Sequence, residues 1–178
     1  MLASAREVFL ERGVEATSIE AVARRAGVSR LTVYRRYRNK QELLVAMLVW
    51  SRDEPGLDLD PERATLDELT EVLTRALVRP QVQQLLVRVA GAAIDHPELI
   101  RAFWRSFVQP RRAELAAVLV RMQELGRFEA GADPDAVMDM VAGAVLYHLV
   151  MRPDERDEDA LRVRARTALR HAGLREER

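Results

Sequence analysis

The stretch TSIEAVARRAGVSRLTVYRRY, residues 17–37, predicts two short helices joined by a tight turn. Thr17 and Glu20 have the spacing of a capping box, so we expect the Thr17 hydroxyl to cap the first helix. Gly27 can close that helix in the left-handed conformation, and Ser29 can cap the second helix. Two helices with so short a connection are typical of a helix-turn-helix motif, in which the second helix enters the major groove of DNA.

The second of these helices presents residue types that suit contact with DNA. Arginine can donate two hydrogen bonds to guanine, and leucine or a threonine methyl group can contact the methyl group of thymine. Val33 and Tyr37 lie one turn apart and are expected to face the core. The side chains predicted to face DNA are those of Ser29, Arg30, Leu31, Thr32, Tyr34, Arg35 and Arg36. An ordinary antiparallel helix pair with solvated arginines is the alternative, but it leaves the coincidence of caps, turn glycine and groove chemistry unexplained.

With these residues, the segment from Glu7 to Leu48 resembles the TetR-type bacterial transcriptional regulators. The matching features are Phe9 in the first helix, the segment from Gly13 to Thr17, and the Gly27-Val28-Ser29 turn. The resemblance implies an all-α fold: an N-terminal three-helix DNA-binding domain with the helix-turn-helix, followed by a C-terminal helical domain for ligand binding and dimerisation.

The resemblance also assigns roles to single residues. It implies that Tyr34 and Arg36 contact the DNA backbone and that Lys40, at the start of a fourth helix, contacts a phosphate; Thr17 and Lys40 complete the predicted DNA-binding set. Asn39 is expected to cap that fourth helix. Leu31 stands where the family often has glycine, so the helix would approach DNA with a larger apolar side chain.

Charge and composition support a nucleic-acid partner only locally. The 178 residues have zero net charge, but residues 1–50 contain nine basic and five acidic side chains, a net charge of +4. There is no cysteine, which excludes disulfides and cysteine-ligated metal sites, and we expect no metal and no cofactor. The motifs of hydrolases, zinc proteases and phosphate-binding loops are missing, so catalysis is not expected.

The rest of the chain reads as a second helical domain. We place the boundary between residues 1–48 and 49–178, with a proline-containing loop from Ser51 to Thr65. Pro97 and Pro134 each suit the first turn of a helix, and Pro110 is expected to kink or split the helix in which it lies. No signal peptide opens the sequence, and the longest apolar run, residues 140–151, is too short to span a bilayer. We therefore expect a cytoplasmic protein.

The last two helices suggest a homodimer. The segment Ala142-Gly143-Ala144 would allow close helix approach, and the apolar surface around it exceeds one stripe, so either the protein's own core or a partner subunit covers it. The resemblance favours the partner. The predicted interface residues are Val137, Val141, Ala144, Val145, His148, Leu161, Ala165 and Ala168. A two-fold dimer would read a palindromic operator with half-sites ~34 Å apart.

The resemblance further implies a pocket for a small apolar or aromatic effector among the C-terminal helices. The candidate lining residues are Met47, Trp50, Leu73, Leu86, Phe103, Trp104, Phe107 and Met122, with plain core packing as the alternative. The function expected is that of a sequence-specific repressor released from its operator by the effector. A transcriptional activator, a ligand-independent regulator, a non-specific architectural DNA binder and a protein-interaction module are the alternatives.

Overall fold

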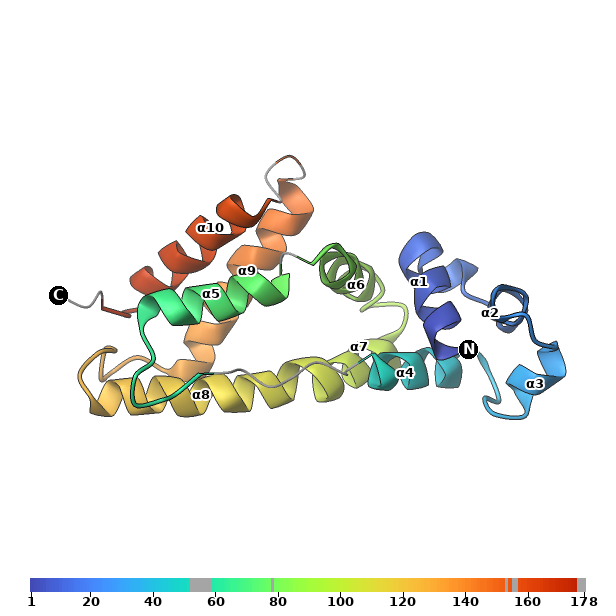
Figure 1. Ribbon diagram of the computed structural model, residues 1–178, viewed down its shortest axis with the longest axis horizontal. Coiled ribbons are helices and arrows are strands. Elements are labelled where there is room, and N and C mark those ends of the chain that lie inside the picture. Colours follow the sequence, from blue (N-terminus) through green and yellow to red (C-terminus); the bar gives the residue numbers. More distant parts are fainter. Residues whose placement is uncertain (52–58, 78, 153, 155–156, 176–178) are drawn as a thin grey trace. The chain divides into compact units, whose positions relative to one another are not determined.

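The structure, a computed structural model, describes residues 1–51, 59–77, 79–152, 154 and 157–175. Over these residues it is helical, without a strand and with one isolated antiparallel bridge between Phe128 and Leu174. The all-α prediction is confirmed. The helices, labelled in Figure 1, are α1 (Leu2–Ala16), α2 (Ile19–Ala26), α3 (Arg30–Tyr34), α4 (Lys40–Trp50), α5 (Leu66–Leu77), α6 (Pro80–Gly91), α7 (Pro97–Phe103), a π-helical segment η1 (Trp104–Val108), α8 (Gln109–Glu124), α9 (Pro134–Met151) and α10 (Glu158–His171).

The helices pack into two compact units. Unit 1 contains residues 1–54 together with residues 84–109, and unit 2 contains residues 55–83 and 110–178. Most of α6 and all of α7 therefore pack with the N-terminal helices. The expected boundary between residues 48 and 49 stays a prediction. Part of the expected loop between Ser51 and Thr65, residues 52–58, lies outside the described residues.

Unit 1 is built around α1, α4 and α7. α1 packs against α2 and α4, and α4 packs against α7. Phe9, Val33 and Leu43 are fully buried in its core, to which α6 contributes Leu85 and Val89. The small N-terminal helices thus gain a larger core than three short helices could provide alone, because α6 and α7 cover it.

The helix that contains Pro110 widens instead of breaking. Proline has no N–H to donate to the carbonyl of Ser106, and its ring crowds that carbonyl, so a regular α-helix is unfavourable there. The chain adopts the π-helical segment η1 just before it, and the N–H of Gln109 bonds to the carbonyl of Trp104. The predicted disturbance is present, and it takes the form of this π-helix.

Unit 2 contains α5, α8, α9 and α10. α10 packs against both α5 and α9, and the core includes Leu69, Met122 and Phe128. Asp133 caps α9 as predicted, since its side chain accepts a hydrogen bond from the N–H of Asp135. The prolines at positions 97 and 134 both begin helices, as expected.

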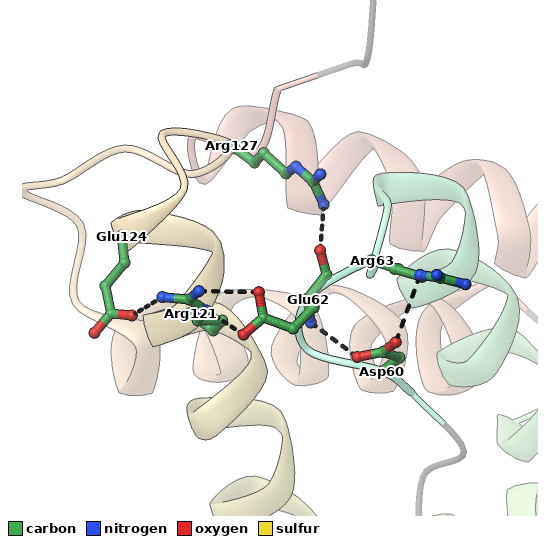
Figure 2. A network of polar contacts seen from close by, with 6 residues as sticks. All are labelled: Asp60, Glu62, Arg63, Arg121, Glu124 and Arg127. Atoms are coloured by element: carbon green, nitrogen blue, oxygen red, sulfur yellow. Dashed lines mark hydrogen bonds and ion pairs between the residues drawn. The ribbon is translucent and has the colours of Figure 1, made fainter.

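An ion-pair network holds the segment before α5 against the end of α8 (Figure 2). The Arg121 guanidinium contacts Glu62 through two nitrogens, at 2.8 and 2.9 Å, and Glu124 at 2.6 Å. Arg127, just beyond α8, donates to the carbonyl oxygen of Glu62 at 3.2 Å. The hydrogen bond from Arg121 lowers the pKa of the Glu62 carboxyl. This network links the chain entering α5 to the end of α8, beside the apolar core in which Ala64 is buried.

Candidate DNA-binding surface

The turn between α2 and α3 has the predicted geometry. Gly27 adopts φ 66° and ψ 28°, in the left-handed region, and its N–H bonds to carbonyls of α2. The N–H of Val28 bonds to the carbonyl of Ala23 at 3.0 Å. The Ser29 hydroxyl accepts a hydrogen bond from the N–H of Thr32 at 3.2 Å, as a helix cap. Both predictions for this turn, the glycine and the cap, are confirmed.

Two predictions for Thr17 are wrong: that its hydroxyl caps α2, and that its side chain contacts DNA. Ser18 caps α2, since its hydroxyl accepts from the N–H of Ala21 at 3.1 Å. Thr17 is fully buried, and its hydroxyl donates to the carbonyl of Gly13 at 2.7 Å. Two adjacent residues could serve as the cap, and the Thr17 side chain is used by the end of α1. A buried side chain cannot contact DNA, so we remove Thr17 from the predicted set.

The outward face of α3 is exposed. Val33 is completely buried and anchors the helix, whereas Leu31 is 61% exposed and Tyr34 is 48% exposed. The remaining side chains predicted to face DNA, those of Ser29, Arg30, Thr32, Arg35 and Arg36, are also exposed. α3 ends at Tyr34, but the N–H groups of residues 35–37 still bond to carbonyls of α3, so the two arginines continue its last turn. We call these seven exposed side chains the reading face.

α2, which supports the reading face, is held against α1 by an arginine that the sequence argument left unassigned. Arg25 contacts Glu11 at 2.6 Å and Glu7 at 3.1 Å. The hydrogen bond from Arg25 is the main cause of a lowered pKa of the Glu11 carboxyl. The spacing of Glu7 and Glu11, one turn apart on one helix, was the available signal.

α4 begins at Lys40 and is capped by Asn39, as predicted. Asn39 accepts a hydrogen bond from the N–H of Glu42 at 2.8 Å, and the Glu42 carboxylate accepts from the N–H of Arg38 at 2.7 Å. The Lys40 ammonium lies 3.3 Å from the carboxylate of Glu15. A phosphate would therefore compete with this carboxylate for Lys40.

The residues predicted to line an effector pocket are divided between the two units. Met47, Trp50, Leu86, Phe103, Trp104 and Phe107 belong to unit 1, whereas Leu73 and Met122 belong to unit 2. Met47 and Phe103 are buried in the core of unit 1, and Met122 in that of unit 2. Phe103 and Phe107 stack with ring centroids 5.1 Å apart. Core packing accounts for Met47, Phe103 and Met122, since helical spacing does not separate a lining residue from a core residue. Trp50 and Trp104 are about half exposed.

A groove of about 560 Å³ lies in unit 2 between α5 and α10, and it differs from the expected pocket. Its lining is mostly charged and contains none of the eight predicted residues: Asp67, Glu68, Thr70, Glu71, Arg162, Val163 and Arg166 line it. Arg162 contacts Glu71 at 2.8 Å, and Arg166 contacts Asp67. These charges are already paired across the groove.

The predicted dimer residues face inward and require a correction. Val137, Val141, Val145, His148, Leu161 and Ala165 are buried within unit 2, and Ala144 and Ala168 are half-buried. The protein's own core covers this side of α9, which was the alternative reading. The apolar excess lies on the opposite side of α9, where Met140, Tyr147, Val150 and Met151 are exposed.

This exposed apolar surface makes α9 unusual within the described part of the chain. It is the one helix there with the length and composition of a membrane span, although a third of it is buried and core helices meet the same criteria. The outward residues recur at helical spacing and gather on one face, with Gly143 among them. We call Met140, Gly143, Tyr147, Val150 and Met151 the outer α9 face.

Comparison with known proteins identifies the family. The family model described as "Bacterial regulatory proteins, tetR family" matches residues 1–47, and "Tetracyclin repressor-like, C-terminal domain" matches residues 58–168. The DNA-binding transcriptional repressor TetR of Mycobacteroides abscessus is 32% identical over 160 residues, covering 83% of this chain and 78% of that protein.

Solved structures share the fold. Salmonella enterica GusR has a TM-score of 0.76 at 21% identity, and the flavonoid-responsive regulator FrrA has a TM-score of 0.68 at 23% identity. Each likeness covers 96% of this chain and 92% of the other. The family models and the TetR repressor above show that this chain belongs to the TetR family of bacterial regulatory proteins, which are DNA-binding transcriptional regulators.

Proposed function

We propose that the protein is a cytoplasmic homodimeric repressor that reads a palindromic operator through the reading face of α3 and is released by a small-molecule effector. The observation that carries this proposal is the exposure of that face on a helix whose only buried side chain is Val33. Arg30 and Arg35 supply donors for guanine, and Leu31 and the Thr32 methyl group supply apolar contacts for thymine. Tyr34, Arg36 and Lys40 are the candidates for contact with the phosphate backbone.

Selection of bound duplexes from a random pool tests this reading directly. A two-fold dimer with one reading face per subunit should enrich a palindrome whose half-sites are about one helical turn apart. A non-specific architectural binder would enrich no consensus, and a protein-interaction module would retain no duplex. Either of these results would refute the proposal.

The outer α9 face is the proposed dimer interface, with a second copy of this chain as its partner. A contiguous exposed apolar face is unusual on a monomer and is typical of a subunit interface. Gly143 has open space around it, so a partner helix could approach its backbone closely. This assignment replaces the inward residues predicted from the sequence, and it keeps the resemblance-based expectation that the last two helices form the interface.

Two matched substitutions test the interface. Val150 on the outer α9 face is 44% exposed, and Val120 on α8 is 45% exposed. Val150→Glu should shift the protein to monomers in analytical ultracentrifugation, because it would place a charge in the apolar interface, whereas Val120→Glu should leave the dimer intact. Equal sedimentation of both variants as dimers would remove α9 from the interface.

The proposed effector is a small apolar or aromatic molecule. Its support is the family and the exposed aromatic surface of unit 1, where Trp50 and Trp104 are both about half exposed. These are the two tryptophans of the chain, so fluorescence of the Trp50→Phe and Trp104→Phe variants reports on each position separately. Screening small aromatic compounds for operator release should identify compounds that also change the emission of one tryptophan. Release without any change at either tryptophan would exclude both as lining residues.

Activation of transcription is the alternative function. Expression of a reporter gene placed behind the operator distinguishes an activator from a repressor.

A further inference from the structure

Glu15 lies where α1, α4 and α7 meet in unit 1. Its carboxylate contacts two basic side chains through different oxygens: Oε2 lies 3.3 Å from Nζ of Lys40, and Oε1 lies 2.7 Å from Nε2 of His96. The hydrogen bonds from His96 and Lys40, in that order, lower the pKa of the Glu15 carboxyl. The negative charge of Glu15 is therefore held between a residue at the start of α4 and a residue at the start of α7.

Lys40 is turned toward α1. Its side chain is only 24% exposed, whereas that of Glu15 is 82% exposed, and its ammonium also lies 3.5 Å from the carbonyl oxygen of Glu15. An ammonium group is a compact point charge, so the charge that Glu15 neutralises is not fully available to a phosphate. Binding of DNA through Lys40 must weaken or break this ion pair.

The partner on the other side of Glu15 is fixed in place. At the start of α7 the backbone carbonyl of His96 accepts a hydrogen bond from the N–H of Leu99 at 2.9 Å. The other ring nitrogen of His96 lies 3.6 Å from the Glu98 carboxylate. Arg88, from α6, donates hydrogen bonds to the carbonyls of Leu10 and Glu11 at 3.3 and 3.1 Å. The chain from Arg88 to His96 is thus attached twice to the C-terminal end of α1.

Gly13 makes the first of these attachments possible. It interrupts α1 with φ 79° and ψ −177°, so the helix does not continue regularly past it. A Cβ atom at this position would lie 3.2 Å from Nη1 of Arg88. The glycine therefore supplies both the unusual backbone conformation and the space for the guanidinium.

We propose that Glu15 is a positioning residue that competes with DNA phosphate for Lys40, and that His96 sets the strength of this competition. The proposal rests on the proposed function and adds its regulation. While His96 holds Oε1, Oε2 faces Lys40 and operator affinity is restrained. Loss of the contact between His96 and Glu15 would make Lys40 available to phosphate. Glu15 and His96 thereby couple α7 to the DNA-binding residues.

A double-mutant cycle on Glu15 and Lys40 tests the competition. Glu15→Gln keeps the shape of the side chain and its contact with His96 but removes the charge. Operator affinity, measured by fluorescence anisotropy, should rise by up to about fivefold in this variant, the range expected for an exposed ion pair. In the Lys40→Met background, Glu15→Gln should give a clearly smaller gain in operator affinity. Lys40→Met alone should weaken binding to all duplexes and reduce the salt slope by about 1.

The results separate this inference from the proposed function. A wild-type protein that does not distinguish operator from random duplex would refute the proposed function itself. With specific binding established, an equal gain from Glu15→Gln in both backgrounds would mean general charge repulsion only, and no gain would mean no competition. Either result would overturn the role of Glu15.

Variants of His96 test the second half of the proposal. His96→Ala should reproduce part of the gain of Glu15→Gln, because the carboxylate is no longer oriented toward Lys40. His96→Gln should restore wild-type affinity, since its amide can donate to Oε1 in place of the ring. Urea unfolding of each variant controls for stability. Wild-type affinity in a folded His96→Ala protein would remove His96 from the mechanism.

Discussion

Thr17 has a structural role in the end of α1 and not a contact with DNA, and Thr17→Val tests this assignment. Valine has nearly the shape of threonine but no hydroxyl, so the substitution removes the 2.7 Å hydrogen bond to the carbonyl of Gly13. Because Thr17 is fully buried, no water can easily replace the lost donor. The carbonyl is left without this partner, and the cost is that of an unsatisfied buried acceptor.

The expected loss in the free energy of unfolding is about 1–3 kcal/mol. In a protein of this size each kcal/mol corresponds to ~2–4 °C in Tm, so Thr17→Val should lower Tm by about 2–12 °C. Thr167, exposed on α10, provides the matched control, and Thr167→Val should leave Tm within about 2 °C of wild type, as surface substitutions cost little. Tm and urea midpoints are measured by circular dichroism.

The affinity for operator completes this test. Measured well below the lowered Tm, the affinity of Thr17→Val should equal that of the wild type, because the side chain lies inside the molecule. A variant with unchanged Tm and weakened DNA binding would refute the reasoning, since Thr17 would then act as the surface contact that its position in the motif first suggested.

Two further predictions concern the turn and the pH dependence. Gly27→Ala should lower the free energy of unfolding by about 1–2 kcal/mol, because an L-residue is strained at the positive φ of this position. Gly91 has a negative φ and open space around it, so the control Gly91→Ala should not lower the free energy of unfolding. Equal urea midpoints of the two variants would contradict the role of Gly27. Since Arg25 lowers the pKa of the Glu11 carboxyl below its ordinary 4.5, Glu11 stabilises the fold above that pH and the contribution is lost as pH falls through its lowered pKa. Arg25→Met should therefore reduce the urea midpoint at pH 7, and the midpoint of the variant should fall less steeply than that of the wild type below pH 4.5. Parallel curves of urea midpoint against pH for the two proteins would show that the ion pair between Arg25 and Glu11 does not contribute to stability.

The local features of the DNA-binding segment could be predicted from the sequence. The caps at Ser29 and Asn39 and the left-handed Gly27 depend on residues only a few positions apart, so short-range pattern is sufficient. Thr17 was misassigned because Ser18 beside it has the same capping chemistry, and the choice depended on the carbonyl of Gly13.

The longer-range features could not be predicted in the same way. An apolar helix such as α9 shows in sequence that it must be covered on several sides, but the sequence does not say which side its own core covers. The sequence analysis placed Val141 in the interface, but the packing of α10 against α9 buries Val141, whereas Tyr147 is exposed. The contact between His96 and Glu15 joins residues 81 positions apart, and no short-range pattern links the two residues.

The central claim is that the reading face of α3 selects the operator by contact with bases, and alanine substitution of its arginines tests it most directly. Arg35→Ala should weaken operator binding by about 1–3 kcal/mol and leave binding to random duplex nearly unchanged, so the specificity ratio falls. Arg101 is an exposed arginine on α7, and Arg101→Ala should change neither the operator affinity nor the binding to random duplex. A folded Arg35→Ala protein with the wild-type specificity ratio, and the same result for Arg30→Ala, would contradict the account.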